Sequence, residues 1–153
     1  MNKNKHNIIV GSEIERTDER INDTGEVFTP IELCIEMVNE IPLDIIKNPQ
    51  SKFLDNSAGN GNFMIALLNK LTEYHSKEHV LNSMIYAVEL MEDNHKEMCK
   101  RLGVDVTHPH YICHDALTYD YSFGESVGLE KFFFSVPLAE LAHRTPNALE
   151  DLL

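Results

Sequence analysis

Hydrophobic residues follow two different spacings along the chain, and the two alternate. Short apolar runs bounded by polar residues predict three buried strands, at 52–55, 84–88 and 111–113. Between these runs, apolar residues recur at helical spacing from 63 to 71. A second helix is predicted from 92 to 102, because the segment has a basic last turn and a glycine follows it. This alternation predicts an α/β fold with a parallel sheet and helices on both faces.

A further helix is predicted ahead of the first strand. Thr29 is its expected N-cap, Pro30 its first helical residue, and Glu32 the residue that closes a capping box with Thr29. Apolar residues then recur at helical spacing until Pro42 ends the run.

The two ends of the chain differ in pattern from its centre. Residues 1–24 are polar, charged and poorly periodic, which predicts a flexible N-terminal arm. A fourth strand is expected at 131–136, and residues 137–153 predict a weakly helical tail. At roughly 150 residues per domain, we expect one domain, spanning residues 25–136.

Composition and charge narrow the class of protein. The chain is 42% hydrophobic and 25% charged, as in ordinary globular proteins. Thirteen basic against twenty-five acidic residues give a net charge of −12, which disfavours non-specific attraction between nucleic acid and this chain alone. A nucleic-acid substrate would need a local basic patch or another chain. Three cysteines without a CxxC spacing, and no signal-like or membrane-spanning run, predict a cytoplasmic protein that binds no membrane.

Three carboxylates follow the three predicted strands. Asp55, Glu89 and Asp115 each come just after the carboxyl end of a strand, and in a parallel α/β sheet that edge holds the ligand crevice. The two oxygens of Glu89 match the adjacent hydroxyls of a ribose, and Asp115 can accept a hydrogen bond from the amine of an adenine. The alternatives are a solvated acid at the start of a helix for Glu89 and a turn or N-cap aspartate for Asp115.

A glycine-rich turn joins the first strand to the following helix. Gly59 and Gly61 allow the backbone to approach a ligand closely. The dinucleotide fingerprint fails, because Met64 occupies the place of its third glycine and Glu89 lies farther on than the roughly 20 residues it requires. With Asp55 ahead of the glycines, the pattern suits a ligand with a cationic amine and a ribose. A sharp turn with no ligand is the alternative.

Four segments in this order, at 25–30, 53–63, 87–90 and 114–117, resemble the motifs of S-adenosylmethionine-dependent DNA adenine-N6 methyltransferases. The resemblance covers residues 25 to about 120. It implies a Rossmann-like methyltransferase fold and S-adenosylmethionine as the cofactor. The cofactor-binding residues that it implies are Phe28, Thr29 and Pro30 at the methionine end, Asp55, Ser57, Gly59, Gly61 and Phe63 in the cradle, Glu89 and Leu90 at the ribose, and Asp115 and Ala116 at the adenine.

The sequence departs from this family at two places. Asn56 stands where the family commonly has proline, which we expect to alter the turn without abolishing binding. The family's Asn/Asp-Pro-Pro-Tyr/Phe motif, which grips the flipped adenine, occurs nowhere, and the expected fourth strand is followed by Pro137-Leu138-Ala139. No catalytic residue is therefore assigned. The fold is expected to be complete to the third strand and then truncated or diverged.

Two functions remain open at this stage, together with a third that is disfavoured. The first is a DNA adenine-N6 methyltransferase with DNA as substrate, acting together with a further domain or chain. The second is a non-catalytic S-adenosylmethionine-binding module, or a subunit whose site a protein partner completes. A small-molecule methyltransferase is disfavoured because Phe28-Thr29-Pro30 is typical of the DNA enzymes.

A metal site is not expected, although four candidate ligands lie close together. Among His108, His110, Cys113 and His114, the first two share one side of an extended segment, whereas Cys113 points the other way. No distant pair of ligands completes a zinc set. The aromatic run at 132–134 is interpreted as part of a buried strand rather than as a stacking platform for bases.

Overall fold

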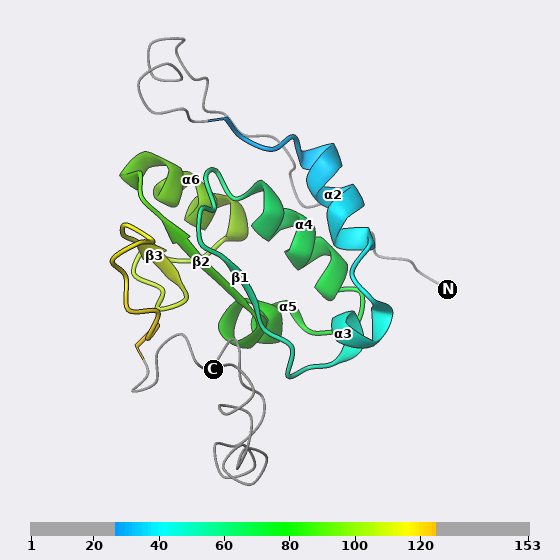
Figure 1. Ribbon diagram of the computed structural model, residues 1–153. Coiled ribbons are helices and arrows are strands. Elements are labelled where there is room, and N and C mark those ends of the chain that lie inside the picture. Colours follow the sequence, from blue (N-terminus) through cyan, green and yellow to red (C-terminus); the bar gives the residue numbers. More distant parts are fainter. Residues whose placement is uncertain (1–26, 125–153) are drawn as a thin grey trace, which may run out of the picture. The chain divides into compact units, whose positions relative to one another are not determined.

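The computed structural model describes residues 27–124 (Figure 1). Contacts divide the chain into two compact units, residues 1–119 and 120–153, and the fold below is that of the first unit. The predicted arm, the fourth strand and the tail lie outside the described residues. No helix in the described part is long and apolar enough to cross a membrane.

Three strands form one parallel sheet in the order β1-β2-β3. They are β1 (Phe53–Asp55), β2 (Ile85–Glu89) and β3 (Tyr111–Cys113). The register pairs Asp55 with Ala87 and Glu89 with Cys113. Figure 1 shows β2 between the two other strands, and every residue of β2 is buried. The predicted α/β fold with a parallel sheet is confirmed.

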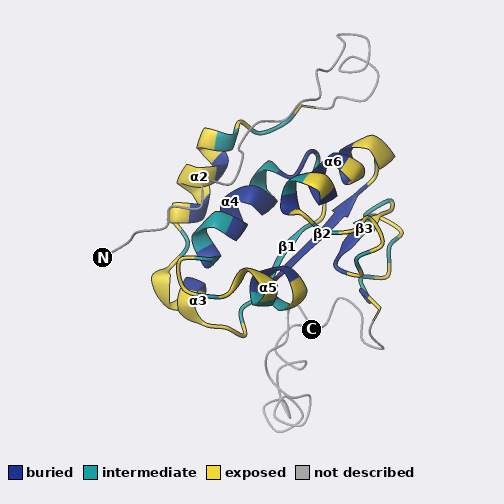
Figure 2. Ribbon diagram, turned by 180° about the vertical axis from the view of Figure 1, so that it is seen from behind, coloured by how far each residue is buried: buried dark blue, intermediate teal, exposed yellow. Residues whose placement is uncertain are grey.

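Two helices connect the strands and pack on the sheet. Helix α4 (Asn62–Leu71) follows β1, and helix α6 (Glu92–Leu102) follows β2. They contact one another and β2, and Figure 2 shows them on the same side of the sheet. Ile85 and Ala87 of β2 belong to the same hydrophobic core as the buried residues of both helices. This packing accounts for the burial of Ile85 and Ala87, which lie on the same face of β2.

The N-terminal helices begin at prolines rather than at a polar cap. Helix α2 (Ile31–Asn39) packs against α4, and its N-cap is Pro30, with no side-chain capping hydrogen bond. The predicted capping box with Thr29 as N-cap is therefore wrong. Pro30 has a ψ of 141°, so it precedes the helix instead of occupying its first turn. Pro42 caps a second helix, α3 (Leu43–Lys47), in the same way. The sequence predicted the helix that precedes Pro42, whereas α3 was not predicted.

A short irregular segment before β2 was not predicted from hydrophobic spacing. Helix α5 (Lys77–His79) begins at Ser76, whose hydroxyl accepts a hydrogen bond from the His79 N–H, and it continues into the π-helix η1 (Val80–Met84). Because Met84 belongs to η1, β2 begins one residue later than its apolar run. The helix expected at 92–102 is confirmed, and Gly103 follows it with a positive φ of 74°.

Gly61 permits the close packing of α4 on α6. It is the N-cap of α4, with a left-handed φ of 84°. A Cβ at this position would lie 2.7 Å from Met98 Cγ and 3.3 Å from Met98 Cα on α6. The missing side chain at Gly61 is therefore required where the two helices meet.

We expect Gly61→Ala to lower the free energy of unfolding by about 2–5 kcal/mol. Both the left-handed backbone conformation and the close contact of the new Cβ with Met98 destabilise the folded state. Chemical denaturation followed by circular dichroism measures the loss. Gly103→Ala is the matched control, because Gly103 is also left-handed but a Cβ there would meet only Lys77 Nζ at 3.6 Å. The control should lose about 1–2 kcal/mol. An equal loss in both proteins would contradict the role given to the Met98 contact.

Candidate functional site

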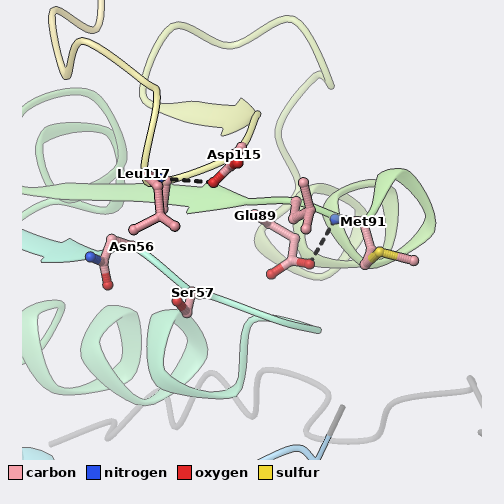
Figure 3. Close-up of a pocket in the computed structure, with 8 residues that line it drawn as sticks. Asn56, Ser57, Glu89, Met91, Asp115 and Leu117 are labelled. Atoms are coloured by element: carbon pink, nitrogen blue, oxygen red, sulfur yellow. Dashed lines mark hydrogen bonds between the residues drawn. The ribbon is translucent and has the colours of Figure 1, made fainter. Parts of the chain in front are cut away.

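A pocket of about 360 Å³ lies at the carboxyl ends of the strands (Figure 3). Its walls come from the three segments that follow β1, β2 and β3. The lining residues are Asn56 and Ser57, then Glu89, Leu90 and Met91, and finally Asp115, Ala116 and Leu117. This is the edge at which parallel α/β sheets hold their ligands. The pocket thus brings together five of the residues predicted for the site: Ser57, Glu89, Leu90, Asp115 and Ala116.

Glu89 is the most constrained side chain of the pocket and is 7% exposed. Its Oε2 accepts a hydrogen bond from the Gly59 N–H at 2.6 Å. Its Oε1 accepts hydrogen bonds from the Met91 N–H at 2.9 Å and from Asn94 Nδ2 at 3.3 Å. A carboxylate has about four acceptor positions, so these three donors leave capacity for a further one. Glu89 therefore joins the glycine turn to the start of α6 and can still accept from a ligand.

Asp115 shapes the turn that follows β3. Its Oδ1 accepts a hydrogen bond from the Leu117 N–H at 2.9 Å, drawn as a dashed line in Figure 3. The arrangement is an Asx turn, so the interpretation of Asp115 as a turn aspartate describes this oxygen. The second oxygen, Oδ2, has no hydrogen bond within residues 27–124. It is available to a hydrogen-bond donor of a ligand in the pocket.

Large apolar side chains at the pocket are exposed to water. Leu90 is 63% exposed and Leu117 is 94% exposed. Leu90 directly follows Glu89, and Leu117 lies two residues beyond Asp115, so each carboxylate has an apolar neighbour. A pocket that combines apolar walls with a few fixed acceptors suits a flat ring system with polar hydrogens at its edge.

Asp55 ends β1 and is not among the residues that line the pocket. Its Oδ1 accepts a hydrogen bond from the Ser57 N–H at 3.0 Å. Burial raises the pKa of the Asp55 carboxyl above its usual range, the bond from Ser57 opposes this, and the charge of Glu89 raises it further. Two carboxylates thus repel one another at this edge of the sheet, and a ligand with a positive charge would relieve the repulsion.

The segment at 28–30 lies beside the glycine turn. A Cβ on Gly59 would lie 2.9 Å from the Phe28 ring, and the Thr29 carbonyl accepts a hydrogen bond from Asn62 Nδ2 at 2.8 Å. Phe63 packs against the hydrophobic core instead. The predicted residues that do not line the pocket are Phe28, Thr29, Pro30, Asp55, Gly59, Gly61 and Phe63.

One residue that contacts the glycine turn, Arg101, was not predicted for the site. Arg101 Nη1 on α6 donates hydrogen bonds to the Asn60 carbonyl at 2.6 Å and to Asn62 Oδ1 at 2.9 Å. Burial lowers the pKa of the Arg101 guanidinium, and the charge of Glu97 opposes this effect. In the sequence Arg101 is only a basic residue in the last turn of a helix, and no local pattern shows that its side chain reaches the turn.

The histidines and cysteine considered as metal ligands have other neighbours. His108 Nε2 lies 2.8 Å from Asn82 Oδ1, and the His110 ring stacks on Tyr86 with a centroid distance of 4.0 Å. Cys113 is a free, exposed thiol. Over residues 27–124, no group of three or more His, Cys, Asp or Glu side chains is placed to hold a metal ion.

We expect Asp55→Asn to stabilise the folded protein at neutral pH. The raised pKa of Asp55 means that the folded state binds more protons than the unfolded state just above the usual carboxyl range. The native protein therefore loses stability as pH rises through that window, whereas the Asn variant does not. The stability advantage of Asp55→Asn should grow from pH 4 to pH 7 in urea titrations.

Asp105→Asn is the control, because it should change the free energy of unfolding at pH 7 in the opposite direction. Hydrogen bonds from the Thr107 hydroxyl and N–H lower the pKa of Asp105. Replacing this carboxylate should therefore lower the stability of the folded protein at pH 7, and the difference should shrink as the pH falls. If Asp55→Asn and Asp105→Asn changed stability in the same direction at pH 7, the effect of burial and charge on Asp55 would be refuted.

Neither a comparison with protein-family models nor one with curated proteins finds a match for this chain.

Proposed function

We propose that this chain binds S-adenosylmethionine at the pocket and forms the cofactor-binding portion of a DNA adenine-N6 methyltransferase. The observation that carries the proposal is the meeting of Glu89 and Asp115 in one pocket, each with a spare acceptor position and each accompanied by an exposed leucine. The motifs at 25–30, 53–63, 87–90 and 114–117 support the same cofactor.

The residues present fit the adenosine part of this cofactor. Glu89 accepts a hydrogen bond from a ribose hydroxyl, and Asp115 Oδ2 accepts one from the exocyclic amine of the adenine. Leu90 and Leu117 supply apolar contact to the adenine ring, which removes these side chains from water. The negative charges of Asp55 and Glu89 at this edge of the sheet favour a ligand that carries a positive charge.

The reaction that we propose is methyl transfer to the amino group of an adenine. The bound cofactor supplies an electrophilic methyl group on its sulfonium. The chain contributes by holding the cofactor in a fixed orientation, which is the main source of rate in a transfer of this kind. The finer fold that we propose is the Rossmann-like methyltransferase fold, with helices on both faces of the sheet.

A DNA-binding partner chain or domain is part of the proposal. The sequence has no Asn-Pro-Pro or Asp-Pro-Pro segment to grip a flipped adenine, and its net charge is −12. These two facts favour the second candidate, a cofactor-binding module or subunit that does not catalyse transfer by itself. In that case a protein partner would supply the adenine pocket and the phosphate contacts.

We expect the purified chain to bind S-adenosylmethionine in isothermal titration calorimetry, and Asp115→Asn to weaken binding by about 1–3 kcal/mol. The Asn side chain keeps an oxygen for the Leu117 N–H but turns a donor toward the adenine amine. Asp44→Asn on α3 removes an exposed carboxylate outside the pocket and should leave the affinity unchanged. Equal affinities of the native protein and Asp115→Asn would contradict the role assigned to Asp115.

We expect no detectable methyl transfer from the chain alone to adenine-containing duplex DNA. Extruding an adenine costs a few kcal/mol, and no residue that could form a grip for the base is recognised in this sequence. Radiolabelled transfer at low salt, with the chain in excess, gives DNA binding its best chance. The same assay with cellular extract added tests for the partner. Sustained turnover by the chain alone would overturn the non-catalytic alternative and show that another residue grips the adenine.

A further inference from the structure

Two side chains of opposite charge hold the turn between β1 and α4. Glu89 accepts the Gly59 N–H through Oε2 at 2.6 Å, and Arg101 donates to the Asn60 carbonyl through Nη1 at 2.6 Å. Neither residue belongs to the turn, because Glu89 ends β2 and Arg101 lies in the last turn of α6. Hydrogen bonds to charged groups are stronger than neutral ones, and more so away from water. The turn is therefore fixed from the sheet and from the helix.

The contacts of Arg101 extend beyond the turn. Its Nη1 also donates to Asn62 Oδ1 at 2.9 Å, and Asn62 Nδ2 donates to the Thr29 carbonyl at 2.8 Å. Thr29 follows Phe28, whose ring lies against Gly59. One guanidinium thus connects α6 with the glycine turn and, through Asn62, with the segment that packs on it.

Holding the glycine turn in one conformation affects ligand affinity, because the glycine backbone would otherwise adopt many conformations. Gly59 and Gly61 both have positive φ angles, 55° and 84°, and glycine loses more conformational freedom on ordering than any other residue. If ligand binding had to order this turn, the affinity would fall by the corresponding entropy. An arginine at the end of a helix ordinarily interacts with the last carbonyls of that helix, whereas Arg101 reaches the turn before α4.

We propose that Glu89 and Arg101 form a clamp that holds the glycine turn in its ligand-binding conformation before the ligand arrives, and that Arg101 is a positioning residue for the cofactor site. The identity of the ligand rests on the proposed function. The clamp itself is a property of the ligand-free chain and is measured without any ligand.

Amide hydrogen exchange followed by NMR on the ligand-free, full-length chain tests the clamp. In Arg101→Met, the Gly59 and Gly61 amides should exchange about tenfold faster or more, because a charge-assisted hydrogen bond to the turn is lost. The amide of Ala87 in β2, which donates to the carbonyl of His110 just before β3, should change much less. Arg101→Lys keeps a cationic donor and should restore part of the protection. Lys96→Met is the matched control, because it removes an exposed cation of α6 that pairs with Glu92.

Calorimetry with S-adenosylmethionine on the same proteins gives the second measurement. Arg101→Met should bind about tenfold more weakly or worse. Arg101→Lys should be intermediate, and Lys96→Met should equal the native protein. This order of affinities should follow the order of the Gly59 exchange rates.

The clamp is overturned if the Gly59, Gly61 and Ala87 amides accelerate by the same factor in Arg101→Met, since Arg101 would then act only on global stability. Unchanged exchange at Gly59 and Gly61 overturns it as well. Should Arg101→Met not fold, the exchange rates of the Gly59, Gly61 and Ala87 amides are compared between Arg101→Lys and the native protein instead. If the native protein binds no S-adenosylmethionine, the proposed function fails, and the exchange rates still decide on the clamp.

Discussion

Parallel pairing of β2 with both β1 and β3 brings the segments after the three strands to the same edge of the sheet. Because β2 is buried throughout and lies between its neighbours, the position of Glu89 at its end is set by the hydrophobic core. From that position the carboxylate reaches the Gly59 N–H across the sheet and the Met91 N–H at the start of α6. The pocket and the glycine turn both take their places from this arrangement.

Much of the fold follows from hydrophobic spacing, and the exceptions have specific causes. The strands were predicted from their short apolar runs and α4 from apolar residues at helical spacing, whereas α6 was predicted from its basic last turn and the glycine that follows it. Helix α3, α5 and η1 were missed because each is five residues or shorter, too short for a period to be recognised. The capping box at Thr29 failed because Pro30 adopts an extended ψ of 141°, so that the helix starts one residue later than predicted. A capping motif alone does not show which of two neighbouring residues, here Thr29 or Pro30, occupies the N-cap position.

In the candidate site, too, some residues could be predicted from the sequence and others could not. Glu89 and Asp115 were predictable because the end of a parallel strand fixes where a side chain lies. The contacts of Gly61 with α6 and of Arg101 with Asn60 join residues that are far apart in the sequence, so only the packed structure shows them. Gly61 was predicted to approach a ligand, and the structure shows in addition that its missing side chain makes room for Met98.

Leu90 and Leu117 form an exposed rim of the pocket whose residues can change independently of the fold. Leu117 is almost wholly in water and supports no part of the core, so its replacement leaves the fold intact while it changes the shape of the rim. Changes at Gly61, in contrast, disturb the packing of two helices. In the proposed cofactor site, substitutions at the rim alone would change which ring system fits. The framework that holds the acceptors would not have to be rebuilt.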